Sequence, residues 1–134
     1  MAVWIEDRQT KIRRATRHDL AAIERLLGRS VGVRFGRRAV ADRRDDVWVA
    51  EEVGGEIVGV MGLAYRRSLS VAGVIVDVDP LVGRRRAVDE GLLDFALARA
   101  RARGGVRVVV SVRTAVTARP GARASEVLVL DPTG

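Results

Sequence analysis

One stretch of the chain, residues 71–104, constrains its fold more than any other: VAGVIVDVDPLVGRRRAVDEGLLDFALARARARG. It begins with a β-branched run, which predicts a strand over 70–78. Alternate side chains of a strand point to opposite faces, so Val76 and Val78 share one face and Asp77 lies on the other. Pro80 then predicts a turn that ends the strand.

An arginine-rich loop leads from this strand into a helix. Apolar side chains at helical spacing predict the helix over 88–103, and Gly104-Gly105 ends it. Three consecutive arginines precede it, namely Arg84, Arg85 and Arg86. The first turn of a helix presents free backbone N–H groups and the positive end of its dipole. The stretch therefore predicts a site for a phosphate-bearing ligand; the alternative is that the arginines form a solvated turn.

Composition indicates a single globular domain over residues 1–134, with 48% hydrophobic and 31% charged residues. Aromatic residues make up 4% of the chain, so the core has to be built from aliphatic side chains. Such residues suit a mixed sheet covered by helices, an α/β (α+β) fold.

The charge and the rare residue types exclude several classes. The formal charge of +7 comes mainly from arginines, since Lys11 is the lone lysine. Because the arginines are spread along the chain without interleaved aromatics, we expect no nucleic-acid partner. Cysteine is absent and His18 is the lone histidine, which argues against disulfides, a metal site and a Ser-His-Asp triad. With neither a signal peptide nor a membrane-spanning run in the sequence, we expect a cytoplasmic protein without a membrane partner.

The rest of the chain predicts strands and helices on both sides of this stretch. Residues 1–10 show no periodicity and predict a loose arm. Thr16, with Asp19 three residues later, predicts a capped helix that ends at Gly28. The other predicted elements are a strand over 11–15, a short helix over 37–44, strands over 46–53 and 56–65 joined by a two-residue turn at Gly54-Gly55, a turn over 66–69, a strand over 106–112, a loop over 114–124 and a last strand over 126–130.

This order of elements resembles the GCN5-related N-acetyltransferase (GNAT) family. Three stretches carry the resemblance: KIRRATRHDLAAIERLL, VWVAEEVGGEIVGVMGL and VIVDVDPLVGRRRAVDEGLLDFALARARARG. The resemblance implies a mostly antiparallel, twisted sheet flanked by helices, here with a shortened C-terminal part. It also implies acetyl-CoA as cofactor. The backbone around Val76 and Val78 would then pair with the pantetheine arm, and the loop would face the pyrophosphate with Arg84, Arg85, Arg86, Ala87, Val88 and Asp89.

The loop departs from the family's pattern of Arg or Gln, two residues, Gly, one residue, then Gly or Ala. With Arg84 at the first position, Ala87 replaces the central glycine and Asp89 replaces the last small residue. These side chains narrow the space for a phosphate, and a carboxylate in the first helical turn competes for the same positive field. Two interpretations stay open: the arginines bind the phosphates in place of backbone groups, or Asp89 is simply a helix cap.

No catalytic residue can be assigned from the sequence. The family usually takes a tyrosine from a helix after the fifth strand, and the stretch TAVTARPGARASEVLVLDPTG contains neither a tyrosine nor room for that helix. Tyr65, the one tyrosine, is either a displaced acid or a residue at the edge of the core. Asp77 is a candidate base on the strand.

Two functions of different classes follow. The first is an N-acetyltransferase that transfers an acetyl group from acetyl-CoA to an amine, with the acceptor approaching through residues 29–45. The second is a non-catalytic domain of the same fold that works through protein contacts, as a homodimer or as a subunit of a complex. The lost glycines and the missing tyrosine favour the second.

Overall fold

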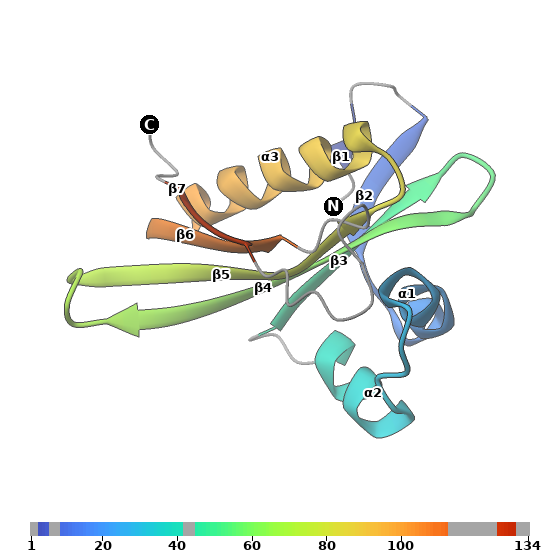
Figure 1. Ribbon diagram of the computed structural model, residues 1–134, viewed down its shortest axis with the longest axis horizontal. Helices are drawn as coiled ribbons and strands as arrows, with labels where there is room; N and C mark the ends of the chain where they lie inside the picture. Colours follow the sequence, from blue (N-terminus) through green and yellow to red (C-terminus); the bar gives the residue numbers. More distant parts are fainter. Residues whose placement is uncertain (1–2, 6–8, 42–44, 113–125, 131–134) are drawn as a thin grey trace.

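A seven-stranded sheet forms the centre of the molecule (Figure 1). The computed structural model describes residues 3–5, 9–41, 45–112 and 126–130. The strands follow one another in the sheet in the order of the sequence, and all neighbours are antiparallel except β5 and β6. They are β1 (Val3–Trp4), β2 (Thr10–Arg14), β3 (Asp45–Glu52), β4 (Ile57–Ser68), β5 (Gly73–Gly83), β6 (Gly105–Val112) and β7 (Glu126–Leu130).

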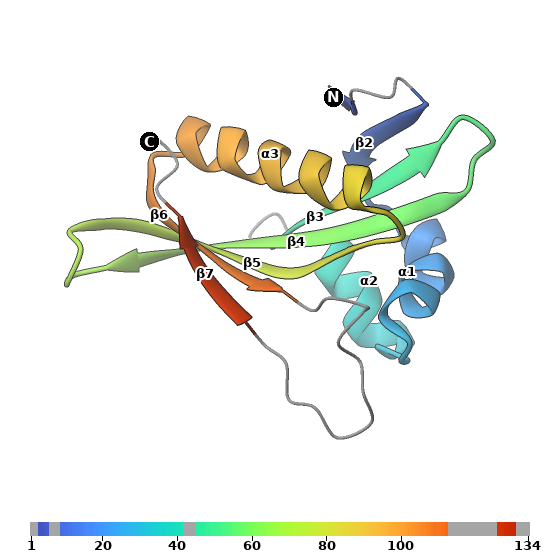
Figure 2. The same ribbon diagram turned by 45° about the horizontal axis from the view of Figure 1, so that its top comes forward.

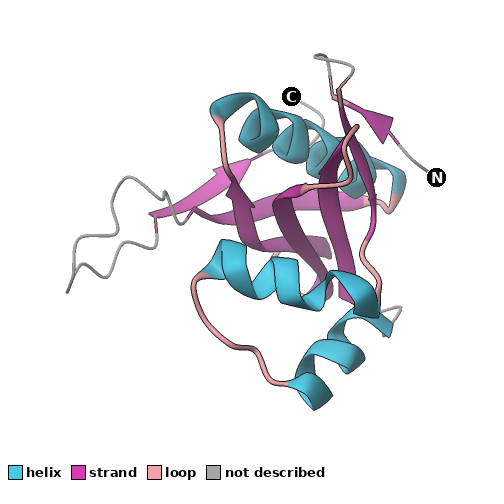
Figure 3. Ribbon diagram, turned by 90° about the vertical axis from the view of Figure 1, so that its right-hand side faces the viewer, coloured by secondary structure: helices cyan, strands magenta, loops and turns pink. Residues whose placement is uncertain are grey.

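The helices cover the two faces of this sheet. The long helix α3 (Arg86–Ala102) lies on one face, and α1 (Leu20–Leu27) and α2 (Val33–Ala41) lie on the other (Figures 1 and 3). A single 3-10 turn, η1 (Arg17–Asp19), leads into α1. The predicted fold class is confirmed, and so is the predicted order of helices and strands, to which the structure adds the short β1 within the arm. Figure 2 shows β7 beside β6 at the edge of the sheet.

The first helix begins and ends at the predicted residues. The backbone N–H of Thr16 donates to Oδ2 of Asp19 over 2.7 Å, as in a capping box. Gly28 adopts a left-handed conformation at φ 68° and ends α1. The predicted helix over 37–44 is wrong in its start, since α2 begins at Val33. Gly36 does not break it because the helix packs tightly there: a Cβ at that position would come within 3.0 Å of Leu20.

The hairpin between β3 and β4 forms where the two glycines predict it, although its turn spans residues 53–56. Gly55 takes a φ of 91°, which favours glycine. The turn predicted over 66–69 is wrong, because β4 continues to Ser68 and pairs there with Gly73. The polar residues that suggested a turn are strand residues instead, and Arg66 Nε donates to Asp77 Oδ2 over 2.8 Å across the strand pair.

The strand β5 also continues past its predicted end. Met61 pairs with Leu81 and Leu63 with Val78, so Asp79 and Pro80 both lie opposite Gly62. This is a β-bulge, one of the few positions in a sheet that accept proline. The prediction of a turn at Pro80 is therefore wrong: the proline bends the strand without ending it, and the connection to α3 shrinks to residues 84–85.

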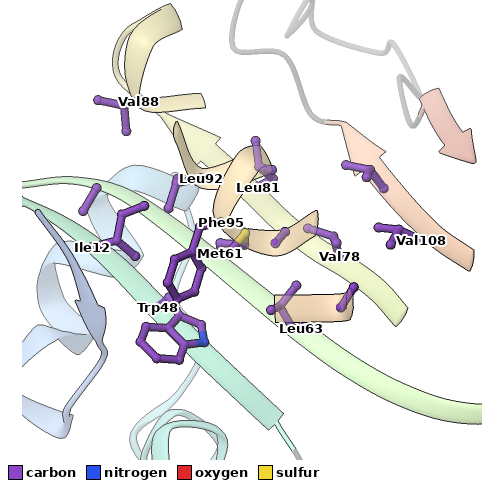
Figure 4. Close-up of a cluster of buried hydrophobic side chains, with 14 of the residues drawn as sticks. Ile12, Trp48, Met61, Leu63, Val78, Leu81, Val88, Leu92, Phe95 and Val108 are labelled. Carbon is purple, nitrogen blue, oxygen red and sulfur yellow. The ribbon is translucent and has the colours of Figure 1, made fainter. Parts of the chain in front are cut away.

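The main hydrophobic core lies between α3 and the sheet. Figure 4 shows Leu92 and Phe95 of α3 with Met61 and Leu63 of β4 in this core, and Met61, Leu63 and Leu92 are at most 2% exposed. Trp48 of β3 packs against Phe95 with ring centroids 4.7 Å apart. A smaller core between α1 and the other face includes Ile23, Val49 and Val60. Each face of the sheet thus binds its own helices through aliphatic contacts.

A buried carboxylate ties α3 to the sheet. The side chain of Asp46 is 0% exposed, and it accepts hydrogen bonds from Arg99 Nε at 2.5 Å, Tyr65 Oη at 2.7 Å and Arg14 Nη2 at 3.0 Å. Arg99 and Arg14 also lie over the Trp48 ring, each 4.8 Å from its centroid. Burial would raise the pKa of Asp46, but the hydrogen bonds from Arg99 and Tyr65 outweigh it and hold the pKa below its ordinary value.

Replacement of this carboxylate should cost much of the stability of the fold. We expect Asp46→Asn to lower the free energy of unfolding by about 3 kcal/mol, because it removes a fully buried charge and leaves the partly buried Arg99 guanidinium and Tyr65 hydroxyl without their anionic partner. Because the pKa of Asp46 is lower in the folded than in the unfolded protein, its ionised carboxylate stabilises the fold above the ordinary pKa near 4. This stabilisation is lost as the pH falls through the pKa of the folded state. Urea denaturation at pH 7 and pH 3 measures both effects, and the variant should lose less stability on acidification.

Asp77→Asn is the matched control, since its ion pair with Arg66 is exposed. We expect a cost below about 1 kcal/mol. A loss at Asp46 no larger than the loss at Asp77 would contradict the role given to the buried network.

Candidate functional site

A cavity of about 280 Å³ lies between the helix pair α1 and α2 and the sheet. Its walls are mostly apolar, with Leu27, Phe35 and Val40 from the helical side. Gly62, Asp79 and Pro80 from the bulge complete it on the sheet side. Asp79 is the charged residue among its described lining, so one carboxyl-bearing residue stands at a largely apolar hollow.

The bulge also separates β5 from β6. The two strands pair from Val74 to Val78, whose partner is Val110, and their described pairing stops there. On the other side, β5 stays paired with β4 as far as Gly83. Among the described residues, the edge of 79–83 that faces β6 therefore has no partner strand. Val76 and Val78, in contrast, pair with β4 and β6 at once.

The three arginines of the predicted anion site are each paired with a glutamate. Arg85 Nη1 contacts Glu52 Oε1 at 2.5 Å and its Nη2 donates to Thr10 Oγ1 at 2.7 Å. Arg86 Nε donates to Glu90 Oε1 over 2.8 Å, and Arg84 forms an ion pair with Glu56. All three guanidinium groups keep solvent contact, but much of their charge is already balanced.

The loop backbone offers an anion few free N–H groups. The Arg84 N–H donates to the Val58 carbonyl over 2.9 Å, and the N–H groups of Val88 and Asp89 donate to the Arg85 carbonyl. Within the described part of the chain, the N–H groups of Arg86 and Ala87 are left as the free first-turn amides of α3. Val88 itself is fully buried and packs in the core.

The carboxylate of Asp89 faces the same place. It accepts a hydrogen bond from the N–H of Gly83, and a Cβ on Gly83 would lie 2.6 Å from its Oδ1. Burial raises the pKa of Asp89 above its ordinary value against the hydrogen bond from Gly83, and the charge of Glu90 raises it further. The loop therefore fits a diphosphate through two amides and three arginines, and Asp89 weakens that fit.

A second, larger cavity of about 480 Å³ lies on the α3 face, away from the bulge. The N-terminal arm forms one wall with Trp4 and Ile5, and α3 forms the other. Ala87 lines it together with the acidic residues Glu90 and Asp94. Arg99 lines it as well, and Glu90 is paired with Arg86, so charges of both signs surround this cavity and it is assigned no ligand.

The candidate catalytic residues of the sequence are engaged elsewhere. Tyr65 Oη donates to Asp46, on the core side of the sheet with α3. Burial and the Asp46 carboxylate raise the pKa of Tyr65 well above its ordinary value. Tyr65 is thus the residue at the edge of the core, and Asp77 is bound to Arg66. Asp79 was missed by the sequence analysis; an acid just before a proline inside a β-branched run is the signal for a bulge that could have identified it.

Comparison with solved structures identifies the fold. A glucosamine-6-phosphate N-acetyltransferase from Arabidopsis thaliana matches with a TM-score of 0.66 at 16% identity, over 87% of this chain and 97% of its own. An acetyltransferase from Trypanosoma brucei matches with a TM-score of 0.63 at 18% identity, over 87% and 94%. A transcriptional regulator from Bacillus halodurans C-125 matches with a TM-score of 0.65 at 17% identity, over 87% and 97%.

Five of the matched structures are named as acetyltransferases, three of them as N-acetyltransferases, so the protein has the fold of the GNAT enzymes, and the resemblance of the sequence to that family is confirmed in its fold. Neither a protein-family model nor a curated protein sequence matches the chain. In the described part of the chain, no helix is long and apolar enough to cross a membrane.

The bulge depends on the absence of a side chain at Gly62. A Cβ there would lie 2.5 Å from the Asp79 carbonyl oxygen, a backbone atom that cannot move without its strand. We expect Gly62→Ala to cost about 2 kcal/mol of unfolding free energy, measured by urea denaturation. Gly54→Ala is the control, because a Cβ at that turn position meets nothing within 4 Å. Equal effects of the two substitutions would refute the close approach.

Proposed function

We propose that the protein is an N-acetyltransferase that uses acetyl-CoA to acetylate an amine. The observation that carries the proposal is the bulge at Asp79-Pro80: it gives β5 an open edge directly beside an apolar cavity that contains a carboxyl-bearing residue. The fold neighbours named as acetyltransferases support this assignment in general.

The open edge at 79–83 is where the pantetheine arm would pair with the backbone. Val76 and Val78, which the resemblance implies for this contact, already pair on both sides, so we place the contact one step further along β5. The amides of Arg86 and Ala87 would face the pyrophosphate, together with Arg84, Arg85 and Arg86. Val88 contributes by packing α3 against Gly59, which holds the helix end in place.

The chain's own residues would prepare the acceptor amine. The apolar cavity excludes water and lowers the pKa of an amine that enters it, which favours the neutral, nucleophilic form. Asp79 would accept the proton that the amine loses. Bound acetyl-CoA would supply the acetyl thioester: as the amine nitrogen replaces the sulfur on the acetyl carbon, coenzyme A would leave as a thiolate that takes a proton from solvent, while the proton of the amine passes to Asp79.

A non-catalytic role remains the second candidate, because Asp89 favours it. Its carboxylate lies at the positive end of α3 and accepts the hydrogen bond from the Gly83 N–H that a phosphate oxygen could otherwise accept. If this contact prevents cofactor binding, the domain would act through protein contacts, as a homodimer or within a complex. Binding of acetyl-CoA separates the two candidates.

Titration calorimetry with acetyl-CoA is the decisive experiment. We expect Asp89→Ala to bind about fivefold more tightly than the unaltered protein, since a charge in the first helical turn is worth about 1 kcal/mol. Asp94→Ala, further along the same helix and exposed, should leave the affinity unchanged. If neither the protein nor the Asp89 variant binds millimolar acetyl-CoA, the enzyme proposal fails and the non-catalytic role stands.

Asp79→Asn tests the proposed base. We expect the rate of acetyl transfer to fall about 100-fold at pH 7, while the affinity for acetyl-CoA stays the same, because the amide cannot accept the proton. Thiol release with a panel of amino acids and N-terminally free peptides measures the rate. Asp77→Asn, on the same strand but paired with Arg66, is the control. An unchanged rate in the Asp79 variant would remove Asp79 from the mechanism.

A further inference from the structure

Much of the positive charge that has no ion pair within the described residues lies on the helix pair that walls the cavity and on the segments that adjoin it. Six arginines of η1, α1, the following loop and α2 are exposed, and none has an ion pair within the described part of the chain: Arg17, Arg25, Arg29, Arg34, Arg37 and Arg38. The two acids of that segment are engaged. Asp19 holds Arg13, with N···O distances of 2.9 and 2.8 Å, and Glu24 accepts the Val31 N–H at 3.2 Å.

This concentration of positive charge destabilises the helix α2. Arg34 lies three positions before Arg37 and four positions before Arg38, so like charges are neighbours on adjacent turns of α2. Arg34 also lies in the first turn, where the helix dipole disfavours a cation. An anionic partner on this surface would remove the repulsion, and within the described residues no acid of the protein does so.

The same helix brings the arginines close to the cavity. Phe35, Gly36, Ala39 and Val40 of α2 line the hollow, while the arginines of α2 are exposed around it. Phe35 is 70% exposed although it is aromatic and apolar, so it offers a contact at the rim. The site thus combines an apolar recess, the exposed acidic residue Asp79 in its lining, and a cationic surround formed by the six exposed arginines.

The extent of the cationic surround indicates an extended anion. At 1.5 Å per residue, α1 and α2 are each about 12 Å long or more. Of the six arginines, three lie on α2 and one each on η1, α1 and the loop between the helices. One phosphate or carboxylate cannot contact charges spread so widely. A single-stranded nucleic acid would need a row of aromatic side chains for stacking, and Phe35 is the aromatic residue in this segment.

We propose that the acceptor is the amine of an acidic polypeptide segment. Its amino group enters the cavity beside Asp79, and its carboxylates lie on the arginines of the two helices. This inference rests on the proposed acetyl transfer for the fate of the amine, but the binding itself requires no cofactor. The two can therefore fail separately.

Fluorescence anisotropy with C-terminally labelled peptides tests the proposal without acetyl-CoA. A glutamate-rich 12-residue peptide with a free N-terminus should bind at least tenfold more tightly than the same peptide with glutamine at each glutamate. The preference should fall as salt rises. Equal binding of the two peptides would overturn the proposal, whatever the protein does with acetyl-CoA. A single-stranded oligonucleotide of the same length that binds more tightly than the acidic peptide would also overturn it, in favour of nucleic acid.

A charge-matched pair of triple variants locates the surface. R34Q/R37Q/R38Q should bind the acidic peptide at least tenfold more weakly, with a melting temperature equal to or above that of the unaltered protein because the repulsion within α2 is gone. R67Q/R101Q/R107Q removes three exposed arginines elsewhere that have no ion pair with any described residue, and it should bind as the unaltered protein does. Equal losses in the two variants would show attraction by net charge alone and would refute the site.

Discussion

The approach of the Gly62 backbone to the carbonyl of Asp79 is the contact on which the rest of the site depends. It lets two residues of β5 stand opposite one residue of β4, and the strand bends there. The bend has three consequences: it opens the β6 side of residues 79–83, it places Asp79 at the cavity, and it lets β5 continue to Gly83, so that only residues 84–85 connect it to α3. A side chain at Gly62 would disturb all three together.

The other face of the sheet holds this arrangement in register. Asp46 of β3 binds Arg99 of α3, Tyr65 of β4 and Arg14 of β2, so one carboxylate joins three strands and the long helix. Such a buried charge contributes specificity as well as stability, because few other placements of α3 would satisfy it. In the proposed function, the α3 face fixes the helix whose N-terminus would face the cofactor, and the face that carries α1 and α2 would receive the acceptor.

The sequence predicted what depends on local pattern and failed where distant residues decide. Helix α1, its cap at Thr16, the hairpin and the strand β6 follow from periodicity and turn chemistry, and they are confirmed. The turn at Pro80 was wrong because a bulge needs the matching glycine on another strand, which no local pattern reveals. The predicted loop over 114–124 lies outside the described residues.

The partners of the charged residues show the same limit of sequence-based prediction most clearly. Arg84, Arg85 and Arg86 stand together in the sequence, yet the first two bind Glu56 and Glu52, 28 and 33 residues away on the hairpin side. The arginines of η1, α1 and α2 are scattered in the sequence and looked like a uniform background, yet none of them has an acid as ion-pair partner among the described residues. In the proposed function, the helices beside the cavity would therefore attract an anion more strongly than the loop that resembles a phosphate site. An enzyme with a weakened cofactor loop would gain most from an acceptor that binds through its own charges.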